Sequence, residues 1–214
     1  FLPDGRLLIT ERSGSLVLID ADSERIPIVG VLEQGESGLL GLALHPEFDQ
    51  NGLLYLYMSY QGAGSPLNRV ERYQFDGKVL SDRMVIIDLI PGDVNHDGGR
   101  IEFGPDGLLY ITTGDASYGP NAQDINSLAG KILRLHDDGT IPADNPFGNA
   151  VYSYGHRNPQ GLAWDEQGQL WSTEHGPSGL GSGYDELNLI EIGGNYGWPD
   201  IQGDQTRVGM ISPR

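Results

Sequence analysis

Two ionisable side chains, His96 and Asp115, flank the most informative stretch of the sequence. His96 lies in a glycine-rich segment, and Asp115 follows an apolar run that ends near Thr113. Between them, residues 104–107 (Gly-Pro-Asp-Gly) have the composition of a tight turn in a β-hairpin, whose outer ends lie together. The two side chains are therefore predicted neighbours, and a histidine oriented by a carboxylate is the usual form of a general base. The residues alone also allow a polar loop histidine and an aspartate that closes a turn.

A second group of polar residues lies in the loop 155–161 (Gly-His-Arg-Asn-Pro-Gln-Gly). Arg157 presents a fixed cationic fork that can hold a carboxylate or a quinone oxygen, and Asn158 can both donate and accept hydrogen bonds. The alternative is a surface turn with a solvated arginine, and the residues alone leave both open. Glu36, in another glycine-rich loop, is a weaker candidate for the same face of the molecule.

Oxygen atoms farther along the chain can bind a hard cation such as calcium. Gly176 and Pro177 suit a turn whose backbone carbonyl groups point outward. Asp185 and Glu186 are adjacent carboxylates, followed by the glycine-rich segment 193–199, and they predict a second site for a hard cation. A plain turn and a solvated acidic pair beside a hairpin are the alternatives, and both stay open.

The composition excludes several classes of function. The chain has 214 residues, of which 38% are hydrophobic, so it can bury a substantial core. Its formal net charge of −17 argues against nucleic acid as a partner, because phosphates need a basic surface. The absence of cysteine excludes disulfides and thiolate metal sites. No stretch approaches the roughly 20 apolar residues of a membrane-spanning helix.

The elements that must position these residues are strands. Period-two alternation and turn residues recur along the chain, whereas helical periodicity is nearly absent. The expected strands cover 6–11, 16–19, 39–44, 53–60, 69–75, 84–90, 108–113, 131–135, 161–164, 170–173 and 187–192, with one more opening at 101. Residues 49–52 are expected to form a turn.

An internal repeat predicts how these strands are organised. Residues 1–10 match residues 103–112 at seven of ten positions, and turn glycines at positions 5, 52, 107 and 168 are 47, 55 and 61 residues apart. A bare propeller blade has about 40–45 residues, so each unit carries a long loop. We predict an all-β fold, a β-propeller, with approximate blades 1–30, 31–92, 93–150 and 151–214. A two-sheet sandwich with chance similarity between turns is the alternative.

Six motifs occur together in this order along the chain. They are GLLGLALHPEF (38–48), NHDGGRIEFGPDG (95–107), GHRNPQGLA (155–163), EHGP (174–177), DELNLI (185–190) and GGNYGWP (193–199). Together they resemble the soluble PQQ-dependent glucose and aldose sugar dehydrogenases, and the resemblance covers essentially the whole chain. It implies a six-bladed β-propeller that holds PQQ and calcium at one end of its channel.

The resemblance also implies roles for individual residues. It makes His96 the base that takes the proton from the C1 hydroxyl of an aldose, while hydride passes to PQQ and the lactone forms. Asp115 would orient this histidine. Arg157, counted with the catalytic residues, and Asn158 would contact PQQ. His175 is a further expected cofactor contact.

The metal sites implied by the resemblance are two. The carbonyl oxygens of Gly176 and Pro177 would bind the cofactor calcium, and Glu186, with Asp185 and the Tyr196 carbonyl, would bind a second calcium. Glu36 aligns with a polar residue near the active-site histidine and is expected to contact the cofactor. The glucose dehydrogenase branch has glutamine there, so the role of Glu36 is left open.

The resemblance extends to location and partners. It implies a periplasmic or extracellular enzyme that acts on an aldose and passes electrons to an external acceptor. Four repeat units are visible, so we expect the strand before Phe1 and roughly two blades of the ring to be missing. Open sheet edges would then favour self-association. A calcium-dependent lactonase and a non-catalytic binding module of the hedgehog-interacting type are the alternative functions.

Overall fold

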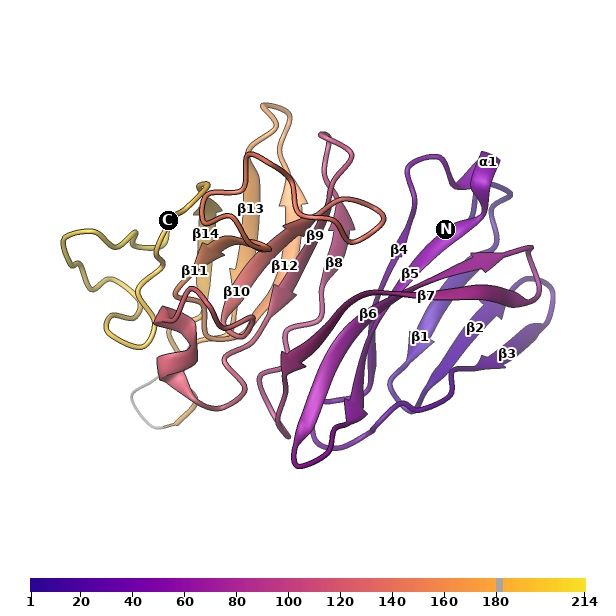
Figure 1. Cartoon of the computed structure of the whole chain (residues 1–214), viewed down its shortest axis with the longest axis horizontal. Coiled ribbons are helices and arrows are strands. Elements are labelled where there is room, and N and C mark those ends of the chain that lie inside the picture. The colour runs from indigo at the N-terminus through magenta and orange to yellow at the C-terminus, as the bar shows by residue number, and fades with distance from the viewer. Residues whose placement is uncertain (180–182) are drawn as a thin grey trace.

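The computed structural model describes residues 1–179 and 183–214, and its regular secondary structure is almost entirely antiparallel β-sheet, joined by long loops (Figure 1). The strands are β1 (Leu7–Glu11), β2 (Ser15–Ile19), β3 (Ser23–Pro27), β4 (Leu39–Leu44), β5 (Leu53–Gln61), β6 (Pro66–Phe75), β7 (Leu80–Pro91), β8 (Ile101–Phe103), β9 (Leu109–Thr113), β10 (Lys131–Leu135), β11 (Val151–Tyr154), β12 (Pro159–Trp164), β13 (Leu170–Glu174) and β14 (Glu186–Ile190). The helical segments are α1 (Phe48–Asn51) and the 3₁₀ turn η1 (Gly119–Gln123).

Four sheets follow one another along the chain, each built from strands that are consecutive in sequence. Their orders are β1-β2-β3, β4-β5-β6-β7, β8-β9-β10-β11 and β12-β13-β14. The early strands of successive sheets lie beside one another, β4 next to both β1 and β8, and β12 next to β9. Sheets that repeat in this way around inner strands form a β-propeller, so the predicted fold class is confirmed for the four blades present here.

One predicted blade boundary is wrong. Strand β11 pairs with β10, and Lys131 lies opposite Tyr154. The third sheet therefore extends to Tyr154, beyond the boundary expected at residue 150. The long loop between the two strands hid this pairing, because sequence periodicity does not show which strand a short apolar segment joins.

Two strands escaped prediction. Strand β3 has the sequence Ser-Glu-Arg-Ile-Pro and is largely exposed, so it lacks an apolar face that alternation could reveal. Strand β11 has only four residues. Where a turn was expected, α1 forms one helical turn that ends at Gly52, whose φ of 63° is in the left-handed region that favours glycine.

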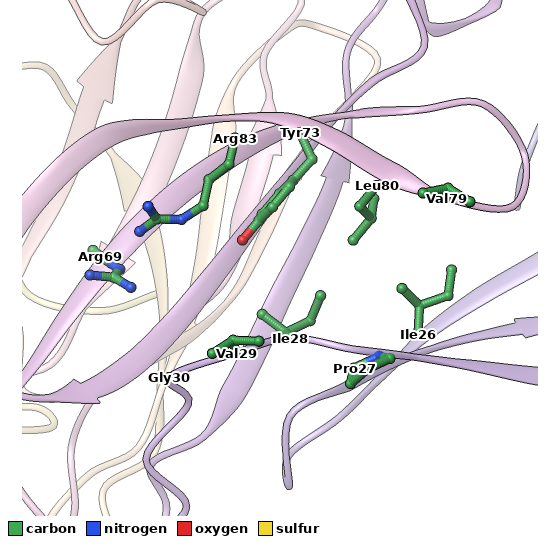
Figure 2. A pocket seen from close by; sticks show the side chains of 10 residues that line it. All are labelled: Ile26, Pro27, Ile28, Val29, Gly30, Arg69, Tyr73, Val79, Leu80 and Arg83. Carbon is green, nitrogen blue, oxygen red and sulfur yellow. The ribbon is translucent and has the colours of Figure 1, made fainter.

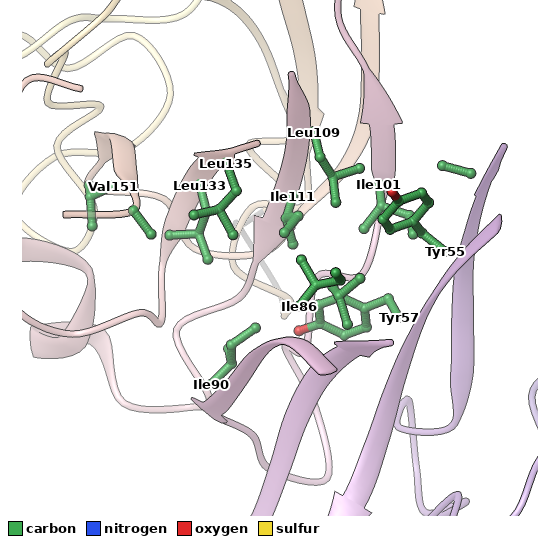
Figure 3. Close-up of a cluster of buried hydrophobic side chains, with 13 residues drawn as sticks. Tyr55, Tyr57, Ile86, Ile90, Ile101, Leu109, Ile111, Leu133, Leu135 and Val151 are labelled. Atoms are coloured by element: carbon green, nitrogen blue, oxygen red, sulfur yellow. The ribbon is translucent and has the colours of Figure 1, made fainter. Parts of the chain in front are cut away.

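The core lies between the sheets, which pack face to face. Leu54 and Leu56 of β5 pack against the first sheet, whereas Tyr55 and Tyr57 of the same strand point to the third sheet. Figure 3 shows the two tyrosines opposite apolar side chains such as Ile111. Alternation along one strand thus serves two interfaces, as expected for a strand buried on both faces.

This topology gathers the candidate residues at one end of the molecule. When the first two strands of a sheet are antiparallel, the loop entering the first and the loop leaving the second lie at the same end. Those loops carry Glu36, His96, Asp115, Arg157 and His175. Segment η1 lies at this end, and α1 lies at the opposite end (Figure 1). In the described part of the chain, no helix is long and apolar enough to cross a membrane.

Candidate active site

The predicted pairing of His96 with Asp115 is present in the structure. Asp115 Oδ1 is 2.8 Å from His96 Nδ1 and accepts a hydrogen bond from the Ser117 backbone N–H at 2.9 Å. Asp115 Oδ2 accepts a hydrogen bond from Trp198 Nε1 at 2.7 Å. The carboxylate is buried and all its bonds come from fixed donors, so it holds the imidazole in one orientation.

The tautomer of His96 follows from this arrangement. A carboxylate oxygen only accepts hydrogen bonds, so the proton of a neutral imidazole lies on Nδ1 and leaves Nε2 as an acceptor. The His96 side chain is 19% exposed, and within residues 1–179 and 183–214 its Nε2 has no hydrogen-bond partner. An imidazole held in this way can take a proton from a bound molecule.

The backbone around the pair is strained. His96, Ala116 and Ser117 have φ angles of 63°, 54° and 57°, which residues other than glycine rarely adopt. Gly114 leaves room for this geometry, because a Cβ atom there would lie 1.9 Å from the His96 carbonyl oxygen. Strain of about 1–3 kcal/mol per such residue is concentrated at functional sites and persists only where the surroundings impose it.

Glu36 and Asn158 join the histidine from two other sheets. Glu36 Oε2 accepts hydrogen bonds from the His96 backbone N–H at 2.9 Å and from Asn158 Nδ2 at 3.3 Å. Asn158 Oδ1 accepts bonds from the Gly98 N–H at 3.0 Å and from Gln160 Nε2 at 2.9 Å. Glu36, Asn158, Gln160 and His175 line one cavity of about 330 Å³, which we call the site cavity.

Arg157 packs against Trp198, the residue whose indole N–H bonds Asp115. Its guanidinium carbon is 5.5 Å from the centre of the Trp198 ring, and its Nη1 donates to the His175 carbonyl oxygen at 3.2 Å. The Arg157 carbonyl oxygen accepts the Asp115 N–H at 2.8 Å. A half-exposed cation is therefore fixed beside the His96–Asp115 pair.

A second histidine–carboxylate pair supports Arg157 from below. His156 Nδ1 is 2.9 Å from Glu174 Oε2, and His156 Nε2 is 2.8 Å from Ser153 Oγ. Glu174 also accepts the Arg157 backbone N–H. The His156 ring stacks on Tyr196 with 4.7 Å between ring centres. Sequence analysis assigned no role to His156 or Glu174, although both lie within the quoted motifs.

Asp97 and Trp198 were also missed. The Asp97 carboxylate is buried beneath the His96 turn, where burial raises its pKa despite bonds from Asn68 and Ser37, both at 2.8 Å. Asp97 directly follows His96 in the sequence, so this adjacency could have indicated that Asp97 lies at the site. Trp198 is far from Asp115 in sequence, and no local pattern links the two.

The candidate calcium ligands lie near the site cavity, but the carboxylates of Asp185 and Glu186 bond to different backbone N–H groups. Asp185 Oδ1 accepts the Gly176 N–H at 2.9 Å, and the Pro177 carbonyl accepts the Gly183 N–H at 3.0 Å. Glu186 accepts the Gly203 N–H at 2.9 Å. Burial and the charge of Glu174, its partner across the sheet, raise the pKa of Glu186.

Tyr196 uses its hydroxyl elsewhere, donating to the Leu189 carbonyl at 2.6 Å. Across residues 1–179 and 183–214, no group of three or more histidine and acidic side chains is arranged to hold a metal ion. The structure thus unites Glu36, His96, Asp115, Arg157 and Asn158 in one network. The second calcium set of Asp185, Glu186 and the Tyr196 carbonyl oxygen stays a prediction.

Comparison with known proteins identifies the family. The family model described as glucose/sorbosone dehydrogenase matches residues 1–213. The chain belongs to this family. Among family relatives, the aldose sugar dehydrogenase YliI of Escherichia coli (strain K12) is 38% identical over 217 residues, which cover 93% of this chain and 57% of that protein. The quinoprotein glucose dehydrogenase B of Acinetobacter calcoaceticus is 34% identical over 239 residues, covering 94% and 49%.

A solved structure within the glucose/sorbosone dehydrogenase family has the same fold. The PQQ-bound form of aldose sugar dehydrogenase from Streptomyces coelicolor superposes with a TM-score of 0.90 at 41% sequence identity. The match covers 99% of this chain and 64% of that one. The chain therefore spans about half the length of the curated relatives, 49% and 57% of the two named above.

Proposed function

We propose that this chain forms the catalytic part of a PQQ-dependent dehydrogenase that oxidises aldose sugars at C1 to the lactone. The observation that carries the proposal is the His96–Asp115 pair, with Nδ1 fixed on a buried carboxylate and Nε2 without a hydrogen-bond partner among the described residues. Removal of hydride from a sugar carbon requires that the hydroxyl proton leave as well, and a base must accept it.

In this proposal His96 Nε2 takes the proton of the C1 hydroxyl. Asp115 stabilises the imidazolium that forms, since its carboxylate already accepts the Nδ1 hydrogen. Glu36 accepts the His96 backbone N–H, and Asn158 donates to the same Glu36 oxygen, so the two residues would hold the His96 turn in place. The bound PQQ would supply the hydride acceptor, which no amino-acid side chain provides.

The donor set at the site fits an oxygen-rich, anionic cofactor. Among the described residues, the only hydrogen bond of the Arg157 guanidinium goes to the His175 carbonyl, so most of its donors are available. Asn158 and His175 line the site cavity next to it. We assign Arg157 to the carboxylate and quinone oxygens, with Asn158 and His175 as further contacts. Glu36, whose carboxylate only accepts hydrogen bonds, would contact a hydroxyl group of the sugar or an N–H group of the cofactor.

Calcium is part of the proposal, because a hard cation prefers oxygen ligands and carbonyl oxygens suit it. The Gly176 and Pro177 carbonyls would hold the cofactor calcium, and the Pro177 oxygen keeps a lone pair beyond its bond from Gly183. Asp185, Glu186 and the Tyr196 carbonyl are the proposed ligands of a second calcium. Their separate hydrogen-bond partners make this second site the weaker part of the proposal.

The rest of the proposal concerns the surroundings of the enzyme. We propose a periplasmic or extracellular location and an electron acceptor that comes from outside the chain. Within the described residues, the two terminal sheets have three strands each and the middle sheets have four, and the last strands of the terminal sheets, β3 and β14, each have one edge without a partner. We propose that these edges pair with a second copy when the 214-residue chain is studied alone.

The two alternatives find less support. A lactonase would hold its calcium on side-chain carboxylates, and the described residues contain no cluster of three or more acidic or histidine side chains for a metal. A binding module would not need a base poised beside a buried carboxylate. Its strained backbone would also have no purpose.

Loading the protein with PQQ and calcium tests the proposal. We expect retained quinone absorbance after gel filtration, and reduction of an artificial dye when glucose or another aldose is added. The same samples are given a sugar lactone, whose hydrolysis would favour the lactonase alternative. Retained quinone without dye reduction by any aldose would contradict the proposed function.

A further inference from the structure

A second cavity, larger than the site cavity, lies on the outer side of the first two sheets. Its volume is about 550 Å³, within the range of about 300–1,000 Å³ for small-molecule sites. One wall is the segment 26–30, at the end of β3, and the other is formed by β6 and β7 (Figure 2). We call it the rim groove. The first of these sheets has three strands and the second has four.

The two ends of the rim groove differ in chemistry. Ile26, Val79 and Leu80 lie at one end, whereas the guanidinium groups of Arg69 and Arg83 lie at the other, with Tyr73 between them (Figure 2). The apolar end is open to water, since Val79 is 55% exposed. Exposed apolar side chains that gather around a groove mark a site for a ligand or partner.

The cationic end carries an unbalanced charge. Arg69 and Arg83 both form ion pairs with the same carboxylate, Glu71, which is completely buried. Although burial raises the pKa of Glu71, hydrogen bonds from Arg83 and Tyr73 and the charge of Arg69 lower it overall. Glu71 therefore stays ionised, and two guanidinium groups share one negative charge.

In the described part of the chain, no second carboxylate pairs with these two arginines. The lining of the rim groove contains no acidic side chain. Asp88 accepts a bond from Tyr60, on whose ring Arg69 stacks at 4.3 Å. Among the described residues, neither arginine forms an ion pair with any carboxylate besides Glu71. Arg83 is 48% exposed at its side chain, so its charge is accessible from the groove.

We propose that the rim groove binds a single-chain amphiphilic anion, a medium-chain fatty carboxylate. Its carboxylate would contact Arg83 and Arg69, and its alkyl chain would cover Ile26, Val79 and Leu80. A planar guanidinium matches a carboxylate in a paired hydrogen bond, and burial of the chain removes apolar surface from water. The site lies apart from the His96 network, so it does not depend on the proposed oxidation of sugars.

Titration of the 214-residue chain with decanoate, below its micelle concentration, tests this proposal by calorimetry and by methyl NMR. We expect saturable binding of one decanoate per chain, with shifts confined to Ile26, Val79 and Leu80. Decanol and butyrate serve as matched probes, one lacking the charge and the other most of the alkyl chain. Each should bind at least about tenfold more weakly than decanoate.

Three variants sharpen the test. Arg83→Gln should weaken decanoate binding about tenfold without changing decanol binding. Val79→Ser should weaken the binding of both, and because Val79 is largely exposed this variant should fold normally. Arg25→Gln is the control. This substitution also removes one positive charge, but Arg25 lies on β3, pairs with Glu11 and is not part of the groove lining.

Several results would overturn the proposal. The absence of saturable decanoate binding would do so, as would equal affinity for decanol and decanoate. Unchanged affinity in both Arg83→Gln and Val79→Ser would place the ligand elsewhere. Formation of dimers on addition of decanoate, without binding of one molecule per chain, would assign the groove to a second copy of the protein.

Discussion

Two histidine–carboxylate pairs lie in neighbouring sheets and have nearly the same geometry, yet their surroundings differ. His96 is 2.8 Å from Asp115, and His156 is 2.9 Å from Glu174. The Nε2 atom of His96 has no partner among the described residues, whereas that of His156 is bonded to Ser153. The His156 side chain is completely buried, and that of His96 is not.

The comparison shows that the contact between histidine and carboxylate does not by itself define a catalytic group. Both rings are oriented by an acidic partner, but of the two only His96 has a ring nitrogen without a hydrogen-bond partner among the described residues. The buried pair instead fixes the backbone N–H of Arg157 and packs on Tyr196. We therefore expect changes at His96 to affect turnover, and changes at the buried pair to affect folding first.

The largest expected effect is on turnover. His96→Gln should lower kcat of the PQQ- and calcium-loaded enzyme about 10²–10⁴-fold, the range for loss of a general base. The fold should be spared, because the strained turn is held by Glu36 and Gly114 rather than by the imidazole. Dye reduction with glucose measures the first quantity, and thermal unfolding measures the second.

The matched control for this variant is His175→Gln. His175 is mostly exposed and lines the site cavity, but it does not contact Asp115. It should change KM more than kcat if it only contacts the cofactor or sugar. Unchanged turnover in His96→Gln would remove His96 from the mechanism and leave the two pairs without a functional difference.

The next effect is on stability. Glu174→Leu should lower the free energy of unfolding by about 3–5 kcal/mol, because it leaves His156 and the Arg157 N–H buried without an acceptor. Chemical denaturation at neutral pH measures this loss. A loss below about 1 kcal/mol would show that the buried pair contributes little to folding, against the comparison drawn here.

Lys131 holds together the backbone segment beside Asp115. Its buried Nζ donates to the carbonyls of Asn121, Ala122 and Ala129 at 2.8, 3.1 and 2.6 Å. Asn121 Nδ2 donates to the Asp115 carbonyl at 2.9 Å. Lys131→Met removes the only donor that holds these three carbonyls together in the described structure, so we expect a loss of about 1–3 kcal/mol near pH 7.

The effect of Lys131→Met on the free energy of unfolding should depend on pH. Burial lowers the pKa of Lys131 from its ordinary 10.5 to about 7. Between these values the unfolded chain holds a proton that the folded chain has released, so this residue adds stability as the pH rises. The difference in unfolding free energy between wild type and Lys131→Met should grow from pH 7 to 10, by up to about 1.4 kcal/mol per pH unit. A difference independent of pH would show that the ammonium keeps its ordinary pKa in the fold.

Much of this arrangement could be predicted from the sequence, because short sequence patterns indicate it. The Gly-Pro-Asp-Gly turn and the repeat located the β8–β9 hairpin, and with it the contact of His96 with Asp115. Propeller architecture followed from the same repeat. Strand β3 could not be found, since polar residues at an exposed outer edge show no alternation.

The contacts that join distant segments were not predictable in the same way. Trp198 bonds Asp115 only because the segment after β14, the last strand of the fourth sheet, lies over the third sheet. Glu174 reaches His156 from another strand, and neither residue shows by its type that it will be buried. The expected second calcium set of Asp185, Glu186 and the Tyr196 carbonyl stays a prediction, and Asp185 lies outside β14, which begins at Glu186.

The smallest expected effect separates the two pairs most sharply, through replacement of each carboxylate by its amide. In Glu174→Gln the amide oxygen can accept the Arg157 N–H, and the NH₂ can donate to His156 once the ring proton moves to Nε2 and bonds Ser153. This change should cost only about 1 kcal/mol of unfolding free energy.

In Asp115→Asn, no change of tautomer can satisfy every hydrogen bond of the new amide. Oδ1 of Asp115 accepts the Ser117 N–H and Oδ2 accepts the Trp198 indole N–H, and neither donor can reverse its role. Either orientation of the amide therefore places its NH₂ against a donor, so we expect a cost about 1–2 kcal/mol larger than for Glu174→Gln. Chemical denaturation of the two variants side by side measures the difference. Equal costs would mean that the surroundings of the two carboxylates are interchangeable, and the contrast between a poised and a structural histidine would then rest on exposure alone.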